Sequence, residues 1–212
     1  MPTDFMSYLG TVTRTVTELQ REGKPARNVT LERTYDTTPD DLWDAVTDPE
    51  RLPRWFLPVS GDLCPGGHYQ LKGNAGGTIA ECVPPRFLSV TWEFGGGVSW
   101  VEVRIGAEGE SQSRLKLSHI CPIDDHWKQY GPGAVGVGWD LGLLGLVLHL
   151  LDRTDKIDEE AFVTSAEGKA YITGACQDWQ RAAVTAGDDA THAEAAAKRT
   201  TAFYTGVPIG DE

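Results

Sequence analysis

The sequence predicts an α+β fold that combines an antiparallel sheet with a few helices. Three observations carry this prediction. Short segments of alternating polar and apolar residues follow one another over 59–121, separated by glycine or proline turns. Two helix start signals interrupt the strands within 38–56, and a strongly apolar helical segment, 138–153, follows the last strand. Alternation with short turns is typical of an antiparallel meander with one wet and one dry face.

The N-terminal part predicts a hairpin. Residues 9–20 alternate Thr with Val or Arg, which is the period of a strand. Residues 22–25 supply a turn, and residues 28–35 resume the alternation. The second of these strands carries on one face Val29, Leu31 and Arg33.

Two short helices are predicted in succession over 38–56. Thr38 can cap the first helix, because Pro39 fits its first position and Asp41 stands where a capping box has a carboxylate. A second start signal follows at once at Asp48. These two helices therefore separate the first hairpin from the meander.

Parity assigns the dry face of the strands, because residues two apart point to the same side. This face is predicted to carry Tyr69, Leu71, Leu88, Val90, Trp92, Phe94, Val101, Val103, Ile105, Leu115, Leu117 and His119. Ser99 and Ser118 are assigned to the opposite face. Parity leaves Glu81 open, since it lies on the dry face if Ile79 does and on the wet face if Cys82 does.

The apolar segment 138–153 lacks a polar stripe, so it must be buried on more than one side, and the sheet is its expected partner. Beyond it the composition becomes rich in alanine, with helices predicted over 164–186 and 188–201. We therefore divide the chain into a main domain, 1–155, in which 1–27 form the first strand and turn, and a C-terminal helical extension, 156–212, packed on the same domain.

The composition excludes some classes of partner. With 31 acidic and 19 basic residues, the net charge of −12 disfavours nucleic acids and anionic membrane surfaces. The N-terminus shows no secretory signal, and the apolar run 141–151 is predicted to be too short to span a bilayer. Four widely spaced cysteines indicate free thiols and a cytoplasmic location. No metal or cofactor is predicted, because His68, His126, Cys121 and Asp125 match no ligand spacing.

A family resemblance is carried by the segments 49–56, 77–79, 84–85, 91–92, 138–139 and 143–144. With these segments the chain resembles the helix-grip fold of the START-like (SRPBCC, birch-pollen-allergen-like) superfamily, over roughly 28–152. Within it, the chain is similar to the branch named after the activator of the heat-shock-chaperone ATPase. The resemblance implies a curved antiparallel sheet wrapped around the long C-terminal helix, with a ligand-size cavity between them.

The predicted function is the binding of a small hydrophobic or aromatic molecule in that cavity, with no chemistry assigned. Aromatic rings from separate elements would wall such a pocket, and His119 would supply a polar anchor. The predicted ligand-binding residues are Trp55, Phe56, Tyr69, Trp92, His119, Trp127, Trp139 and Leu143.

Alternative functions stay open. A cyclase- or hydrolase-type enzyme would use His119, with Glu81 as a second acid–base candidate, although no Gly-x-Ser-x-Gly motif is present. A co-chaperone-like module would act through its surface, but no motif supports a chaperone partner. A homodimer built through the extra helices is a further possibility. The glycines of 131–136 satisfy a dinucleotide-binding pattern, yet no parallel strand is expected before them.

Overall fold

A computed structural model describes residues 4–151 and 157–207 of the chain. These residues form two compact units. The first unit comprises Met1–Leu31, Cys121–Leu144 and Ile157–Glu212, and the second comprises Glu32–Ile120 and Gly145–Lys156. This division does not test the predicted boundary at residue 155, which stays a prediction. Strand β2 (Lys24–Tyr35) and helix α4 (Gly133–Leu150) contribute residues to both units.

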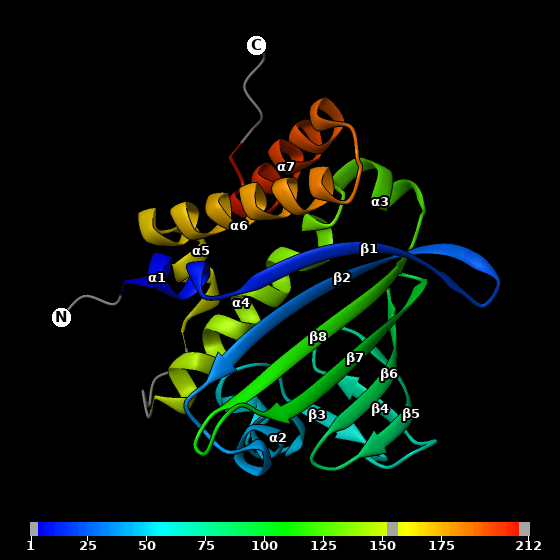
Figure 1. Cartoon of the computed structure of the whole chain (residues 1–212), viewed down its shortest axis with the longest axis vertical. Helices are drawn as coiled ribbons and strands as arrows, with labels where there is room; N and C mark the ends of the chain where they lie inside the picture. The colour runs from blue at the N-terminus through cyan, green and yellow to red at the C-terminus, as the bar shows by residue number, and fades with distance from the viewer. Residues whose placement is uncertain (1–3, 152–156, 208–212) are drawn as a thin grey trace. The chain divides into compact units, whose positions relative to one another are not determined.

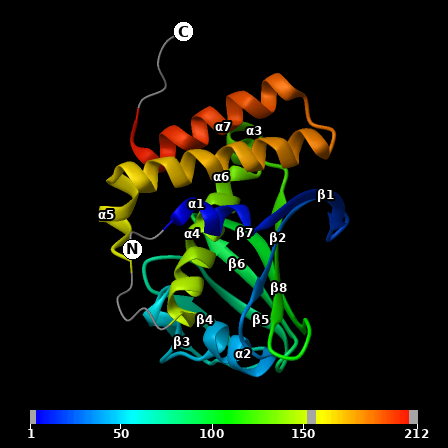
Figure 2. The ribbon, with the colours of Figure 1, turned by 60° about the vertical axis from the view of Figure 1, so that its left-hand side comes forward.

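The first unit is mainly helical. Its other elements are α1 (Phe5–Gly10), β1 (Thr13–Arg21), α3 (Asp125–Tyr130), α5 (Glu159–Thr164), α6 (Ala166–Thr185) and α7 (Ala190–Thr205). Helices α6 and α7 lie side by side, as Figures 1 and 2 show, and α6 also contacts α1 and β1. The two C-terminal helices predicted from the alanine-rich sequence are thus confirmed, whereas α1 falls where a strand was expected to begin.

The second unit contains most of the sheet. Its other elements are α2 (Pro39–Thr47), the 3-10 helix η1 (Leu52–Arg54), β3 (Val59–Gly61), β4 (His68–Leu71), β5 (Gly76–Val83), β6 (Phe87–Phe94), β7 (Gly97–Ala107) and β8 (Ser113–Pro122). The sheet has eight strands in the order β1-β2-β8-β7-β6-β5-β4-β3, and neighbours from β3 to β8 pair antiparallel (Figure 1). The predicted α+β fold with an antiparallel sheet is confirmed.

Strand register defines one face of this sheet, which we call the apolar face. Val90 pairs with Val101, and Val101 pairs with His119, so these side chains share a side. By the same pairing, the apolar face carries Tyr69, Ile79, Leu88, Val90, Trp92, Ser99, Val101, Val103, Ile105, Leu115, Leu117 and His119. The parity assignment is confirmed for these apolar residues. It was wrong for Ser99, which has the same parity as Val101 and pairs with Trp92.

A register shift in β5 explains why parity left Glu81 open. Ile79 pairs with Val90 on the apolar face, but Glu81 then pairs with Ser89 on the opposite face. A β-bulge inserts one extra residue and so reverses the alternation beyond it. Glu81 is therefore exposed and points away from the apolar face.

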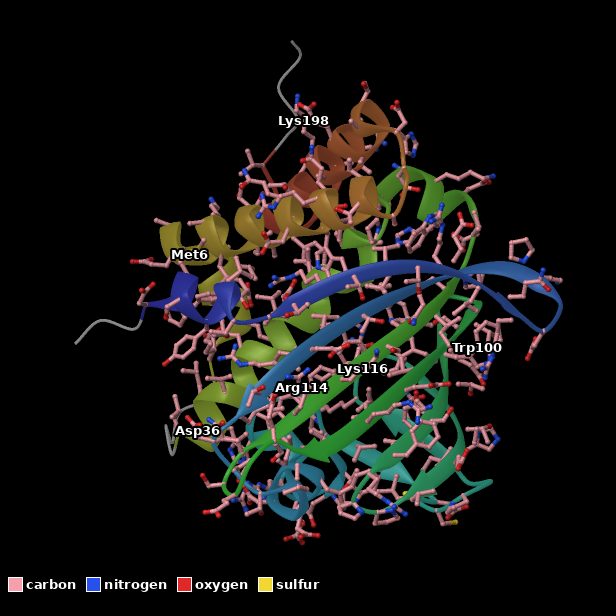
Figure 3. All side chains as sticks on the ribbon, in the orientation of Figure 1. Met6, Asp36, Trp100, Arg114, Lys116 and Lys198 are labelled. Atoms are coloured by element: carbon pink, nitrogen blue, oxygen red, sulfur yellow. The ribbon has the colours of Figure 1, made fainter. Side chains whose placement is uncertain are left out.

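The opposite, polar face is covered by ion pairs. Glu32 of β2 contacts Lys116 at 3.0 Å and Arg114 at 3.7 Å, both on β8. Figure 3 marks Arg114 and Lys116 along β8, and Asp36 just past the end of β2.

Phe94 lies at the hairpin between β6 and β7 and is 62% exposed, so the prediction that it belongs to the dry face is wrong.

The predicted short helices form, with the cap as expected. The Thr38 side chain accepts a hydrogen bond from the Asp41 amide at 3.3 Å, and Pro39 opens α2. Asp48 accepts hydrogen bonds from the amides of Glu50 and Arg51 and thereby starts the turn that leads into η1. The second helix is only a short 3-10 turn of three residues, Leu52–Arg54.

Helix α4 begins five residues earlier than predicted, at Gly133, and has 18 residues. By length and composition alone the whole helix, which extends beyond the apolar run 141–151, could cross a membrane. However, 56% of it is buried within the protein, as in the core helix of a folded domain. Within the described residues, no other helix meets these criteria.

Glycines at the start of α4 allow close packing within the first unit. A Cβ at Gly136 would lie 2.2 Å from the Trp179 ring of α6, and one at Gly133 would lie 3.1 Å from Thr200 of α7. Gly133 and Gly136 therefore serve helix packing.

Candidate functional site

Three side chains of the apolar face meet in the second unit, close to the hairpin between β6 and β7. Trp92 of β6, Ser99 of β7 and His119 of β8 come from three adjacent strands. The His119 Nε2 lies 2.8 Å from the Ser99 Oγ, and the rings of Trp92 and His119 are 5.9 Å apart in an edge-on arrangement. Sequence parity predicted two members of this group and missed Ser99.

His119 and Ser99 form a hydrogen-bonded pair whose donor depends on the tautomer of the imidazole. The Ser99 hydroxyl also lies within donating distance, 3.2 Å, of the Trp92 carbonyl. His119 is only 3% exposed, and burial lowers its pKa to about 3. The imidazole is therefore neutral at physiological pH and suits hydrogen bonding better than proton transfer.

Tyr69 is held at the edge of the same face. Its hydroxyl donates to the Thr91 carbonyl at 2.7 Å, one residue before Trp92. Strand β5 passes close to the same carbonyl, since a Cβ at Gly77 would lie 2.3 Å from the Thr91 oxygen. Gly77 also has a φ of +153°, which favours glycine. The segments 77–79 and 91–92, on which the family resemblance rests, thus fix the strands beside Trp92.

Trp55 and Phe56 form a stacked pair after η1, with ring centres 5.4 Å apart. The Trp55 indole donates to the Ala45 carbonyl at 2.8 Å, which ties η1 to α2. A Cβ at Gly145 of α4 would lie 2.6 Å from the Trp55 carbonyl oxygen. Trp55 is buried and fixed by these contacts, whereas Phe56 is half-buried.

Arg51 connects the helical elements around this pair. Its guanidinium contacts Asp41 at 2.7 Å and Asp44 at 2.9 Å, both on α2, and its Nε donates to the His149 Nε2 at 3.0 Å. Hydrogen bonding to Arg51 lowers the pKa of Asp41. The sequence placed Arg51 in a family segment, and the structure shows that it joins α2, η1 and the end of α4.

Three predicted ligand-binding residues belong to the first unit. Trp139 and Leu143 lie on α4, and Trp127 lies on α3. Trp127 is 8% exposed and borders a hollow of about 30 Å³ that Trp179 also lines. A space of this size holds a water molecule rather than an organic ligand. The role of Trp127, Trp139 and Leu143 in ligand binding therefore stays a prediction.

The polar face carries a second, open hollow of about 390 Å³ near β3, β4 and β5. Gly76 helps to keep this space open. A Cβ at that position would lie only 2.6 Å from the Gln70 side chain. His68 borders the hollow and lies 3.2 Å from the Gly77 carbonyl through its Nδ1. Over residues 4–151 and 157–207, no group of three or more His, Cys, Asp or Glu could hold a metal ion.

Sequence reasoning missed a buried ionic network in the first unit. Asp140 of α4 is fully buried and contacts the Arg14 guanidinium of β1 at 2.7 Å. The Trp179 indole donates to the same carboxylate at 2.9 Å, and Asp178 contacts Arg14 at 2.9 Å. Burial raises the pKa of Asp140, and Arg14 partly offsets this rise. A carboxylate inside an apolar helix needs buried partners, and this signal could have prompted a search for Arg14.

The fold and this arrangement define a protein class, the helix-grip fold of the START-like (SRPBCC) superfamily. The family model described as Activator of Hsp90 ATPase homolog 1-like protein matches residues 36–146. This segment is about half of the chain. The chain therefore belongs to the Activator of Hsp90 ATPase homolog 1-like family, and the predicted resemblance is confirmed.

Solved structures show the same relationship. CalU16 from Micromonospora echinospora is 30% identical in its crystal structure, with a TM-score of 0.68 over 81% of this chain and 97% of that chain. Its solution NMR structure gives 28% identity and a TM-score of 0.71 over 83% and 97% of the two chains. An HSP90 activator from Plasmodium falciparum is 25% identical, with a TM-score of 0.51 over 58% of this chain and 95% of that chain. No curated protein matches the chain.

The similarity to CalU16 extends beyond the family segment, because it covers 81% of this chain. The family as a whole supports ligand binding, or an interaction with Hsp90, as a general function.

Proposed function

We propose that the protein binds a small hydrophobic or aromatic molecule against the apolar face of its sheet. The group of Trp92, Ser99 and His119 carries this proposal, because it sets a half-buried indole beside a neutral hydrogen-bonding pair on an otherwise apolar surface. Ligand sites typically combine apolar and aromatic walls with a few polar groups that orient the ligand.

In this proposal Tyr69, Trp92 and His119 contact the ligand, and Trp55 and Phe56 border it. Trp92 would stack on the ligand, while the His119 and Ser99 pair would orient one polar atom of it. The contributions of Trp127, Trp139 and Leu143 remain predictions from the sequence.

The proposal keeps the other expectations of the sequence. We place the protein in the cytoplasm, supported by the free thiols of Cys64, Cys82, Cys121 and Cys176. The main domain, 1–155, would act with the extension 156–212 attached. A homodimer is compatible with this function and is tested by measuring the mass in solution.

The test compares two tryptophans on opposite faces of the sheet. The protein is purified from its native host, and co-purifying small molecules are identified by mass spectrometry. The molecule found should raise the melting temperature of the protein, and Trp92→Ala should abolish this shift. Trp100→Ala is the matched control, because Trp100 pairs with Thr91 on the polar face of β7 and is also half-buried. Equal loss in both variants would contradict the proposal.

A second candidate function, hydrolase- or cyclase-type catalysis, is favoured by one contact, the Ser99 Oγ to His119 Nε2 distance of 2.8 Å. A histidine whose pKa is lowered to about 3 is a weak base, which argues against it. Turnover of ester or polyketide-like substrates that disappears in both Ser99→Ala and His119→Gln, with the fold intact, would establish this candidate over simple binding.

A co-chaperone role would follow the family name. It predicts that the protein changes the ATPase rate of Hsp90, and that this effect survives a bulky substitution on the apolar face such as Val101→Trp. The binding proposal predicts no effect of the protein on that rate.

A further inference from the structure

Strand β2 places a second polar pair on the apolar face. Glu32 contacts Lys116 on the polar face, so the alternate residues Arg33 and Tyr35 point to the apolar face. Both are buried, with exposed fractions of 8% for Arg33 and 4% for Tyr35. The Arg33 guanidinium lies 5.5 Å from the centre of the Tyr35 ring, so the two side chains form one group.

Contacts between β2 and β8 locate this pair along the sheet. The Ser113 hydroxyl donates to the Thr37 carbonyl, and Glu32 reaches Lys116, so the two strands run in opposite directions. The contacts of Glu32 with Lys116 and of Gln112 with Asp36 then set Tyr35 near Ser113 and Arg33 near Leu115. His119 follows on the same strand and the same face, so one apolar surface separates two polar groups.

The Tyr35 hydroxyl has no hydrogen-bond partner among the residues that the structure describes. A buried hydroxyl without a partner costs free energy, so such a group indicates a missing ligand or water. Burial raises the pKa of Tyr35 despite the nearby Arg33. The phenol therefore keeps its proton and can donate it to an acceptor atom of a ligand or to a water molecule.

Resting on the proposed function, we propose that Arg33 and Tyr35 bind an oxyanion at one end of the hydrophobic ligand, such as a carboxylate or an ionised phenol. Arg33 supplies a permanent positive charge and Tyr35 a directed hydrogen-bond donor, and an oxyanion accepts from both. The rest of the chain opposes anions, given its net charge of −12. Any preference for an anionic ligand must therefore come from a local site.

The spacing of the two polar groups sets the length of the ligand. Leu115 and Ser113 lie four and six residues before His119 on β8. At about 3.3 Å per residue, the groups are roughly 13–20 Å apart. An elongated aromatic molecule with an acidic oxygen at one end spans this distance, and its other end reaches His119 and Ser99.

Two fluorescent probes with one aromatic skeleton test the inference. Anilinonaphthalene sulfonate carries an oxyanion, whereas phenylnaphthylamine lacks only the sulfonate. We expect the wild-type protein to bind both, with higher affinity for the sulfonate. Tyr35→Phe and Arg33→Gln should each weaken sulfonate binding about tenfold and leave phenylnaphthylamine binding unchanged. Arg114→Gln removes the same charge from the polar face, where the Arg114 side chain is 53% exposed, and should change neither affinity.

The outcomes separate the two proposals. Loss of both probes in Trp92→Ala, together with selective loss of the sulfonate in Tyr35→Phe, supports both. Retention of sulfonate affinity in Tyr35→Phe and Arg33→Gln, while Trp92→Ala still weakens both probes, overturns the oxyanion site alone. If neither probe responds to Trp92→Ala, the binding proposal fails and the inference fails with it. Tyr35→Phe removes only a hydroxyl without a partner, so the variant should fold and keep the test decisive.

Discussion

Tyr171 and Tyr35 are both buried tyrosines, one in each unit, but they differ in the hydrogen bonding of their hydroxyl groups. Tyr171 of α6 is 1% exposed and donates to the Asp140 carbonyl at 3.0 Å. Tyr35 of β2 is 4% exposed and has no hydrogen-bond partner among the described residues. Tyr171 belongs to a polar network whose partners all lie within the first unit. Tyr35 lies on the apolar face, and its hydroxyl donor is unused.

Hydrogen-bond satisfaction distinguishes buried polar groups that stabilise the fold from those that are available to a ligand. The buried network around Asp140 satisfies its carboxylate with Arg14 and Trp179, so it has no capacity left for a ligand. It holds α6 against α4 and β1. The apolar face of the second unit instead keeps the Tyr35 hydroxyl without a partner among the described residues, and this is where a ligand is expected.

The largest expected effect is the loss of the closed network. Asp140→Ala leaves the Arg14 guanidinium buried, with a side chain 5% exposed, and without its main partner. We expect it to lower the free energy of unfolding by about 3–5 kcal/mol in urea titrations. Asp178→Asn is the control, because that carboxylate is 21% exposed and should cost about 1 kcal/mol or less. An equal loss of unfolding free energy in the two variants would mean that Asp140 stabilises the first unit no more than Asp178 does.

Alanine substitutions at two glycines of α4, one in each unit, would compare how tightly the two units are packed. A methyl group at Gly136 would lie 2.2 Å from the rigid Trp179 ring, and one at Gly145 would lie 2.6 Å from the Trp55 carbonyl. Each alanine substitution should cost about 1–3 kcal/mol despite the better helix propensity of alanine. Gly10→Ala, where nothing lies within 4 Å, should be neutral or slightly stabilising. Melting curves of the three variants check this order.

The buried His119 makes the stability of the second unit depend on pH. Its pKa in the folded protein is lowered from 6.5 to about 3, so the unfolded chain takes up the proton first as the pH falls. Stability is therefore complete above pH 6.5 and decreases toward pH 3, by at most about 1.4 kcal/mol per pH unit. His119→Gln should reduce the pH dependence of the urea unfolding midpoint between neutral and mildly acidic pH. An unchanged profile would show that His119 titrates normally.

The smallest effect is expected from the two tyrosines themselves. Tyr171→Phe breaks a buried hydrogen bond and should cost about 1 kcal/mol. Tyr35→Phe removes a donor without a partner and should leave the ligand-free protein unchanged or slightly more stable. Both are measured by urea unfolding of the ligand-free protein. Destabilisation of similar size in both variants would mean that Tyr35 has a partner in solution, such as ordered water.

Local patterns predicted much of the sheet. The alternation of β6 and β8 correctly placed Trp92 and His119 on one face, because the period of a strand is set by the backbone alone. The same rule could not place Glu81, since a bulge adds a residue without a clear mark in the sequence. Ser99 has the parity of Val101 and lies on the apolar face, so its predicted place on the opposite face was wrong.

The candidate site was predicted only in part. Aromatic residues were identified by type, but the sequence could not separate Trp92, beside His119, from Trp127, packed with Trp179 around a small hollow. Arg33 was predicted to share a face with Val29 and Leu31, yet its proximity to Tyr35 and the unpartnered Tyr35 hydroxyl depend on surroundings that no local pattern encodes.

By itself, the sequence determined the family, the α+β class, the caps of the short helices and the face on which most strand residues lie. These depend on backbone periodicity and on residues close in the chain. Only the tertiary structure decided that Arg14 pairs with Asp140, that Ser99 meets His119, and that Tyr35 is left with a free donor. Hydrogen bonds between distant residues depend on three-dimensional distance and burial, and a linear pattern of residue types contains neither.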